Sequence, residues 1–134
     1  MMTAAKTRSA VSTGRMDTAL LVDGNVLIRT PLAQYLRTCG FKVLEARNSD
    51  EALAILQNSA DSIHVVLSDA EQGFVLSRWI KVHSAQIKIV LTGTFERAAQ
   101  AAAELCESGP LANRPYDPQL LVQEIKASLA KAEE

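Results

Sequence analysis

The segment HVVLSDAEQGFVLSRW, residues 64–79, places a strand-like run, two acids and a helix-like run in immediate succession. Its apolar residues are largely β-branched and end at Ser68, after which Asp69 and Glu71 follow. Short apolar runs of this kind are typical of strands buried on both faces of a parallel sheet. Helical spacing resumes at Phe74, so very little chain separates the acids from the next element. We therefore expect a strand whose carboxyl end carries two acids close to the start of a helix.

Apolar runs of similar length recur along the chain and alternate with helical patterns. The runs expected to form strands cover 18–22, 41–46, 64–68, 87–92 and, more weakly because Gly109 and Pro110 shorten it, 109–113. The segments with helical spacing cover 26–38, 48–56, 74–82, 95–107 and a last helix from 117. Alternation of strand and helix predicts an α/β fold, in which right-handed crossovers place helices on both faces of a parallel sheet.

Local signals mark the starts of several expected helices. Asn48 followed by Glu51 has the spacing of a capping box. Asp117 before Pro118 has the pattern of a cap followed by proline in the first turn. Pro31 is less regular, because it either kinks the helix over 26–38 or marks a first turn that begins after Thr30.

The composition excludes several classes of protein. The chain has 134 residues, 48% of them hydrophobic, and a net charge of −1, which suits one globular domain and provides no basic field for nucleic acid or an anionic membrane. Nothing approaches the ~20 apolar residues of a membrane span, and the start lacks the apolar core of a secretory signal. We expect a cytoplasmic protein with a disordered tail over 1–16 and one domain over 17–134.

The cysteines, histidines and tryptophan give no pattern of a metal or redox site. Cys39 and Cys106 make neither a disulfide framework nor a zinc site, and both lie in helical context, so we expect reduced, packed thiols. His64 and His83 match no ligand spacing, and Trp79 is expected to pack against the sheet.

Chemically active residues follow the expected strands. Asp23 follows the first strand, Asp69 and Glu71 the third, Thr92 ends the fourth and Arg114 follows the fifth. Sites in open α/β sheets lie outside the carboxyl ends of the strands, so these residues should share one cleft. Clustered carboxylates repel one another unless a hard divalent cation such as Mg²⁺ neutralises them. A carboxylate in such a cleft can also attack a phosphoryl group to give an acyl phosphate.

Four segments in order resemble the receiver domain of bacterial two-component response regulators. They are LLVDGNVLIRTPLAQYLRTCGFKVLEA (20–46), VVLSD (65–69), IVLTG (89–93) and RPYDPQLLVQEI (114–125). The resemblance runs from about Thr18 to about Ala132. It implies the flavodoxin-like receiver fold, a doubly wound three-layer structure with a five-stranded parallel sheet in the order 2-1-3-4-5.

The resemblance also implies a role for each matching residue. Asp69 matches the phosphorylated aspartate, and Asp23 matches the first acid after the first strand. Glu71 matches the position whose backbone carbonyl binds Mg²⁺, so Asp23, Asp69 and Glu71 form the expected metal site. Thr92 matches the switch hydroxyl. The last match is Arg114 for the family's lysine, followed by Pro115 through a peptide bond that is usually cis in the family.

This sequence departs from the family pattern at four places. Gly24 stands where the second acid, normally a direct metal ligand, is found, so we expect weak Mg²⁺ binding. Arg114 replaces a compact ammonium with a planar guanidinium. The segment between Asp69 and Gly73 is shorter than in the family. Leu111 stands where the family has an aromatic switch residue.

Three functions follow, and the sequence leaves them open. The leading one is a stand-alone, non-enzymatic response regulator in a phosphorelay, which takes a phosphoryl group from a histidine kinase or phosphotransfer protein and signals through a downstream protein partner. The alternative is a degenerate pseudo-receiver that binds proteins without phosphorylation. The third is a small flavodoxin-like enzyme or nucleotide binder. The sequence disfavours it, because it contains no glycine-rich phosphate loop. We expect no nucleic-acid or membrane partner, and a homodimer stays open.

The expected site residues also have plainer readings, which remain open at this point. Asp69 and Asp23 can act as helix caps. Glu71 can be a solvated loop acid, Thr92 a cap, and Arg114 a structural partner of Asp69.

Overall fold

A computed structural model of the protein describes residues 17–133. Within them the strands are β1 Thr18–Val22, β2 Lys42–Ala46, β3 Val65–Asp69 and β4 Lys88–Thr92. The α-helices are α2 Val26–Thr38, α3 Ser49–Ser59, α4 Ala70–His83, α5 Phe95–Glu107 and α6 Pro118–Ala132, and a short 3-10 helix, η1, covers Ala60–Ser62. The expected disordered tail, 1–16, lies outside the described residues.

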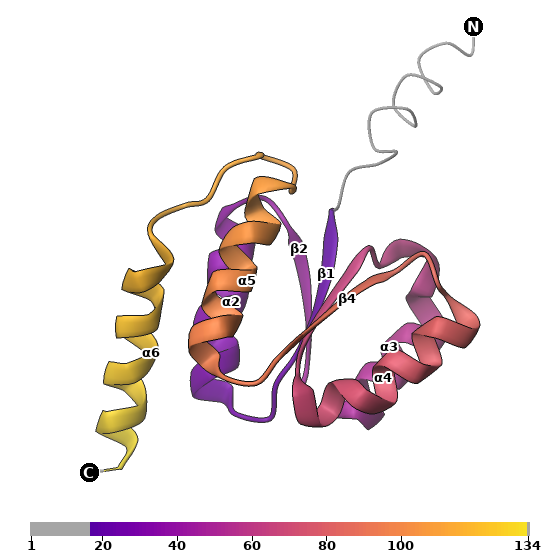
Figure 1. Cartoon of the computed structure of the whole chain (residues 1–134), viewed down its shortest axis with the longest axis horizontal. Coiled ribbons are helices and arrows are strands. Elements are labelled where there is room, and N and C mark those ends of the chain that lie inside the picture. The colour runs from indigo at the N-terminus through magenta and orange to yellow at the C-terminus, as the bar shows by residue number, and fades with distance from the viewer. Residues whose placement is uncertain (1–16, 134) are drawn as a thin grey trace, which may run out of the picture.

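The strands form a parallel sheet in the order β2-β1-β3-β4. Helices α2 and α5 cover one face and α3 and α4 the other, while α6 packs against α2 and α5 as an outer layer (Figure 1). This arrangement confirms the predicted α/β, doubly wound fold. It brings the carboxyl ends of β1, β3 and β4 to one edge of the sheet, where α2, α4 and α5 begin.

Two apolar cores lie on opposite faces of the sheet, as the alternation of side chains along buried strands requires. Ala19 and Leu21 of β1 pack toward α2, α5 and α6, whereas Leu20 and Val22 pack toward α3 and α4. All four are buried, which explains why the first strand is a continuous apolar run.

The helix starts follow their predicted caps. The Asn48 side chain accepts a hydrogen bond from the Glu51 N–H at 2.9 Å, and Asp117 accepts one from Gln119. Helix α2 begins at Val26, so Pro31 lies inside it rather than in its first turn. Helix α4 begins at Ala70, earlier than the expected start at 74, because Asp69 is itself the cap.

The predicted fifth strand is wrong. Within 109–113 the chain forms a turn, in which the Ala112 N–H donates to the Gly109 carbonyl at 3.0 Å. Ala112 has a φ of 53°, which is incompatible with a strand. Pro110 offers no N–H to a ladder. The segment packs over Gly40, whose φ of 100° needs glycine and whose added Cβ would lie 3.1 Å from Leu111.

The prediction of reduced cysteines is also wrong. Cys39 and Cys106 form a disulfide, with a Cα–Cα distance of 5.7 Å. Cys39 directly follows α2, and Cys106 lies in the last turn of α5. Both are buried, so the bond ties together two helices that cover the same face of the sheet.

None of the helices within 17–133 has the combination of length and apolar character that crossing a membrane requires.

Candidate functional site

The third strand ends in the residue that starts the next helix. Asp69 is the last residue of β3, and its Oδ1 accepts a hydrogen bond from the Gln72 N–H at 2.8 Å. The side chain of Gln72 in turn accepts from the Ser49 N–H at 2.9 Å, which joins α4 to the start of α3. The Asp69 carboxylate is therefore held at the carboxyl edge of the sheet with one oxygen engaged in capping.

The first strand places a second carboxylate at the same edge. Asp23 Oδ1 accepts a hydrogen bond from the Asn25 N–H at 2.8 Å. Burial raises the pKa of Asp23 above its usual 3.8, and the charge of Asp69 raises it further, against the Asn25 N–H and the Arg29 cation, which lower it. The two carboxylates are thus electrostatically coupled, as charged groups sharing a small cleft must be.

The fourth strand adds a hydroxyl. Thr92 is the register partner of Asp69 in the β3–β4 ladder, and its side chain is largely buried. Next along the chain, Gly93 leaves open space where a Cβ would stand. Thr94 then caps α5 by accepting from the Arg97 N–H at 3.2 Å.

These residues line one cleft of about 280 Å³. The lining comes from the ends of β1, β3 and β4 and from the helices that follow them: Asp23, Ile28, Asp69, Ala70, Glu71, Thr92, Gly93, Thr94 and Phe95. The structure therefore brings together four of the predicted site residues, Asp23, Asp69, Glu71 and Thr92. Their roles in binding or chemistry stay predictions.

The cleft supplies oxygen donors of the kind that fit Mg²⁺. Carboxylate and carbonyl oxygens are the ligands that this ion takes, with water completing the shell. Asp23 and Asp69 each keep one oxygen outside the hydrogen bonds described above. Residues 17–133 contain no group of three or more acidic, histidine or cysteine side chains placed to hold a metal. Gly24 leaves room for a further ligand, because an added Cβ would meet Arg47 O at an ordinary 3.4 Å.

Arg114 does not belong to the cleft, and the prediction that it would converge there is wrong. Its guanidinium contacts Glu107 at 2.6 Å, at the end of α5. Helix α5 begins at the cleft and runs back to the opposite edge of the sheet, where the loop after it lies (Figure 1). Because no fifth strand forms, the chain does not run back along the sheet to the cleft before it reaches residue 114. Nor is any peptide bond in the described residues cis, so Pro115 follows through a trans bond.

A different arginine, Arg29 of α2, lies beside the site. Its Nη1 donates to the Asp23 carbonyl at 2.8 Å, and its Nε contacts Glu45 at 2.9 Å. The Arg29 side chain is 12% exposed, so its charge acts in a partly desolvated setting. The sequence contained one usable signal for it: Arg29 lies four residues after Asn25, one helical turn from the cap at the cleft.

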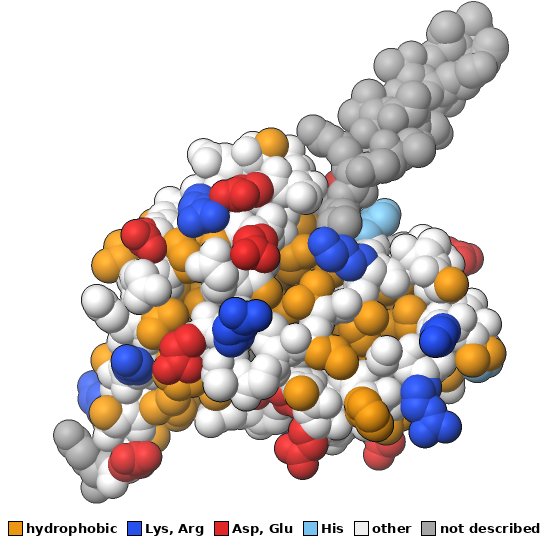
Figure 2. Space-filling model, in the orientation of Figure 1, with side chains coloured by type: hydrophobic (Ala, Val, Ile, Leu, Met, Phe, Trp, Pro, Cys, Tyr) orange, Lys and Arg blue, Asp and Glu red, His pale blue; other side chains and the backbone are white. Residues whose placement is uncertain are grey.

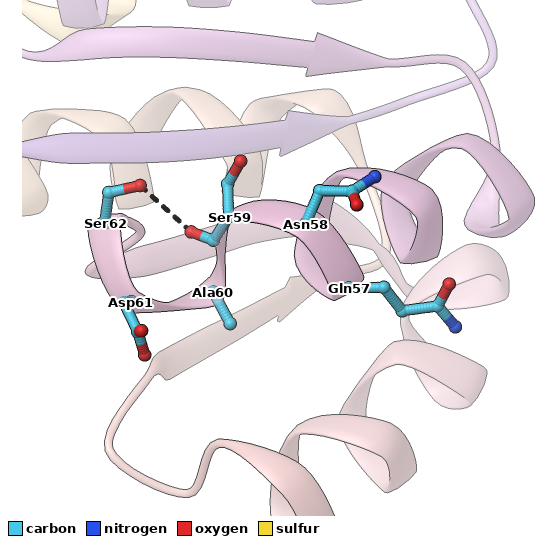
Figure 3. Close-up of a pocket in the computed structure, with 6 residues that line it drawn as sticks. All are labelled: Gln57, Asn58, Ser59, Ala60, Asp61 and Ser62. Atoms are coloured by element: carbon cyan, nitrogen blue, oxygen red, sulfur yellow. Dashed lines mark hydrogen bonds between the residues drawn. The ribbon is translucent and has the colours of Figure 1, made fainter.

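A larger hollow of about 380 Å³ lies at the turn between α3 and β3, where six consecutive residues, 57–62, line it (Figure 3). Ser62 Oγ donates to the Ser59 carbonyl at 3.0 Å (Figure 3). The Asn58 amide donates to the Ala54 carbonyl at 2.9 Å. The hollow gathers a single stretch of chain and contains one charged residue, Asp61, so its shape reflects a local turn.

Comparison with known proteins agrees with this geometry. No family model matches the chain. Two transcriptional regulatory proteins of Pseudomonas aeruginosa are similar to it. GltR is 32% identical over 120 residues, which cover 85% of this chain and 49% of that protein. AruR is 30% identical over 114 residues, covering 80% and 47%. The chain thus spans about half the length of the curated relatives it matches.

Solved structures share the fold across nearly the whole domain. A response regulator receiver domain protein from Clostridium thermocellum superposes with a TM-score of 0.56 at 23% identity, covering 87% of this chain and 97% of that one. The chain has the fold of a response regulator receiver domain and is similar in sequence to about half of each of the two transcriptional regulatory proteins.

Two further structures with this receiver fold are complexes. CheY6 of R. sphaeroides, bound to the P1 domain of CheA3, matches with a TM-score of 0.53 at 24% identity, covering 87% of this chain and 99% of that chain. The CheX–CheY–BeF3–Mg complex from Borrelia burgdorferi matches with a TM-score of 0.54 at 18% identity, covering 89% and 93%. At these identities the likeness is one of fold.

Proposed function

We propose that this receiver domain accepts a phosphoryl group on Asp69 and transmits the change through protein contacts. The observation that carries the proposal is the pairing of Asp69 with Thr92 at the last rung of the β3–β4 ladder, with Asp23 in the same cleft. The acceptor carboxylate, a hydroxyl and a second acid are thereby fixed by the sheet rather than by mobile loops.

The chemistry is a transfer from nitrogen to oxygen. An Asp69 carboxylate oxygen attacks the phosphorus of a phosphohistidine, the P–N bond breaks, and the histidine nitrogen leaves with the bond electrons and takes up a proton. The product is an acyl phosphate on Asp69. Mg²⁺, when bound by Asp23 and Asp69, supplies the positive charge that such transfers require.

The chain's own groups act at defined points. Asp69 Oδ1 accepts the Gln72 N–H, which orients the carboxylate, while the other oxygen accepts no hydrogen bond from the described residues. The start of α4 stabilises negative charge there, because the first N–H groups of a helix form its positive pole. Thr92 provides the nearby hydroxyl, which can donate to a phosphoryl oxygen.

A histidine kinase or phosphotransfer protein is the proposed donor, in the cytoplasm. A CheY-type receiver bound to a CheA P1 domain has the same fold, which supports this class of partner. The output is proposed to be a protein contact, with the domain acting as a stand-alone regulator.

The test is intact mass measurement of the full chain after incubation with acetyl phosphate and Mg²⁺. The proposal expects a gain of one phosphoryl group, which Asp69→Asn abolishes and excess EDTA suppresses. Beryllofluoride with Mg²⁺ should shift the NMR resonances of 92–95 and 69–72. A chain that gains no mass and shows unchanged spectra at saturating Mg²⁺ would instead be a pseudo-receiver that binds proteins in a fixed state.

A further inference from the structure

The outer edge of β4 is open. In the described part of the chain β4 pairs with β3 on one side, and no strand, helix or loop pairs with its other side. Figure 2 views the molecule from the side of this edge. Hydrophobic side chains form a band across this side, between charged ones (Figure 2). Leu91 is 39% exposed there. A sheet edge that presents backbone groups and apolar side chains is a template for another strand.

The backbone groups at this edge can be assigned from one hydrogen bond. The Lys88 N–H donates to the His64 carbonyl, on the β3 side, at 3.1 Å. Because successive residues of a strand direct their N–H and C=O groups to opposite sides, Val90 and Thr92 also face β3. Ile89 and Leu91 therefore direct their backbone groups outward.

We infer that two copies of this domain associate in an antiparallel manner along β4. With Val90 opposite its counterpart, Ile89 of each copy lies opposite Leu91 of the other. Both residues direct their backbone groups outward, so each such pair exchanges N–H···O bonds in an antiparallel ladder. Ile89 packs toward the α3–α4 core, so Ile89 and Leu91 share that face and make apolar cross-strand pairs. Lys88 lies opposite Thr92 rather than opposite another lysine.

The charges beside β4 are complementary under the same symmetry. Arg97, Gln100 and Glu104 of α5 line a groove beside Leu91 and Thr92, with Arg97 nearer the cleft end of the strand. A two-fold axis through Val90 reverses the row, so that Arg97 of one copy meets Glu104 of the other at both ends. Within one copy Glu104 accepts only a long contact of 3.4 Å from Gln100 among the described side chains.

On the α3–α4 face of the sheet, an exposed aromatic side chain and an apolar groove are complementary under the same two-fold symmetry. Phe74 of α4 is 72% exposed and shares a helical stripe with Ser77 and Lys81. Ser77 and Lys81 belong to a groove of about 310 Å³ that is otherwise lined mainly by Ile80, Ala85, Ile87 and Ile89. Reversal of the second copy places its Phe74 over this groove, which combines an aromatic anchor with a pocket.

The domain's own segment 109–113 does not pair with the outer edge of β4. It lies near the start of β2, where it packs on Gly40 and is close to the Cys39–Cys106 disulfide. The self-complementary register and the reversed charge row favour a second copy over an unrelated strand. The inference does not depend on phosphorylation of Asp69, so the two can fail separately.

The test is the dimer dissociation constant of the full chain without any phosphoryl donor, measured by sedimentation equilibrium. Arg97→Glu alone and Glu104→Arg alone should each weaken the dimer roughly tenfold or more, because each creates like-charge contacts across the axis. The double variant Arg97→Glu with Glu104→Arg restores opposite charges and should return the constant to within about threefold of wild type. Both residues are exposed, so folding should persist.

A matched pair of apolar variants provides a second measurement. Leu91→Lys should abolish the dimer, whereas Leu120→Lys, at a residue 54% exposed on α6, should leave it unchanged. Circular dichroism confirms that each variant is folded. A chain that stays monomeric at every concentration overturns the inference, as does a dimer that tolerates Leu91→Lys or is not restored by the double charge swap.

Discussion

Asp69 and Thr92 occupy the last paired position of neighbouring parallel strands, so the proposed phosphoacceptor and the hydroxyl beside it are fixed by sheet register. Asp23 approaches from the end of β1, and its raised pKa reflects burial first and the neighbouring Asp69 second. The cleft therefore contains the two acids that match the family, Asp23 and Asp69. It does not contain Arg114, which was expected there, and position 24 is glycine where the family has a second acid.

Gly24→Asp should tighten Mg²⁺ binding by roughly tenfold, because a further carboxylate adds negative charge and a ligand beside Asp23, Asp69 and Glu71. The backbone tolerates the change, since an added Cβ meets Arg47 O at 3.4 Å. Isothermal titration with MgCl2 measures the effect. Gly24→Asn is the matched control, which adds similar bulk without charge and should change the affinity little. Equal affinity in all three proteins would show that position 24 does not face the ion.

Asp23→Asn should raise the melting temperature by a few degrees at pH 7 in EDTA. The folded state raises the pKa of Asp23 above 3.8, so this carboxyl favours folding when protonated and opposes it when ionised. Its contribution is present below pH 3.8 and is lost as the pH rises through the folded pKa. The advantage of the variant should accordingly vanish below about pH 3.8.

Mg²⁺ provides the control for that measurement. It should raise the melting temperature of the wild-type domain and leave that of Asp23→Asn nearly unchanged. A variant less stable than wild type at pH 7 would contradict the assigned direction of the Asp23 pKa.

Arg114→Ala should leave phosphorylation by acetyl phosphate within about twofold of wild type, because the side chain lies outside the cleft. Its partner Glu107 is 55% exposed, so the lost ion pair should lower the free energy of unfolding by at most about 1 kcal/mol. Glu107→Ala is the matched control and should cause the same small loss in urea titrations. Abolished phosphorylation in Arg114→Ala would mean that the turn after α5 reaches the cleft during transfer.

Reduction of the Cys39–Cys106 bond should lower the free energy of unfolding by about 2–4 kcal/mol, because the bond closes a long loop, with a sequence separation of 67. Urea titrations with and without dithiothreitol measure the difference. The double variant Cys39→Ala with Cys106→Ala should be insensitive to dithiothreitol. Two thiols that react with an alkylating reagent in the unfolded, unreduced protein would show that the bond does not form.

Local patterns predicted most of the fold. The strands up to Thr92 and the helices capped by Asn48 and Asp117 lie where short-range spacing placed them, since caps and periodicity are properties of neighbouring residues. The strand predicted after α5 does not form, for a physical reason. Leu111 follows Pro110, which offers no N–H, and precedes Ala112, whose φ is 53°. Leu111 and Pro110 instead pack over Gly40, which is distant in sequence.

The site was predictable where it depended on strand ends and not where it depended on tertiary contacts. Asp23, Asp69, Glu71 and Thr92 lie together because parallel strands end at one edge. Arg29 was missed because its ion pair with Glu45 is a tertiary contact between α2 and β2. The Cys39–Cys106 pair was missed because the two cysteines are distant in sequence. Arg114 was misplaced because its predicted position required a strand that does not form.

The junction at Asp69 has a mechanical consequence. Strand β3 ends at this residue and α4 begins at the next, so no slack separates the proposed acceptor from the helix. The carboxylate that would take the phosphoryl group also anchors the first turn, through Gln72. A partner that tilts α4 must therefore turn the carboxylate with it. If Asp69 is phosphorylated as proposed, the helix is a lever on the reactive group, and a partner bound to α4 would set the lifetime of the acyl phosphate.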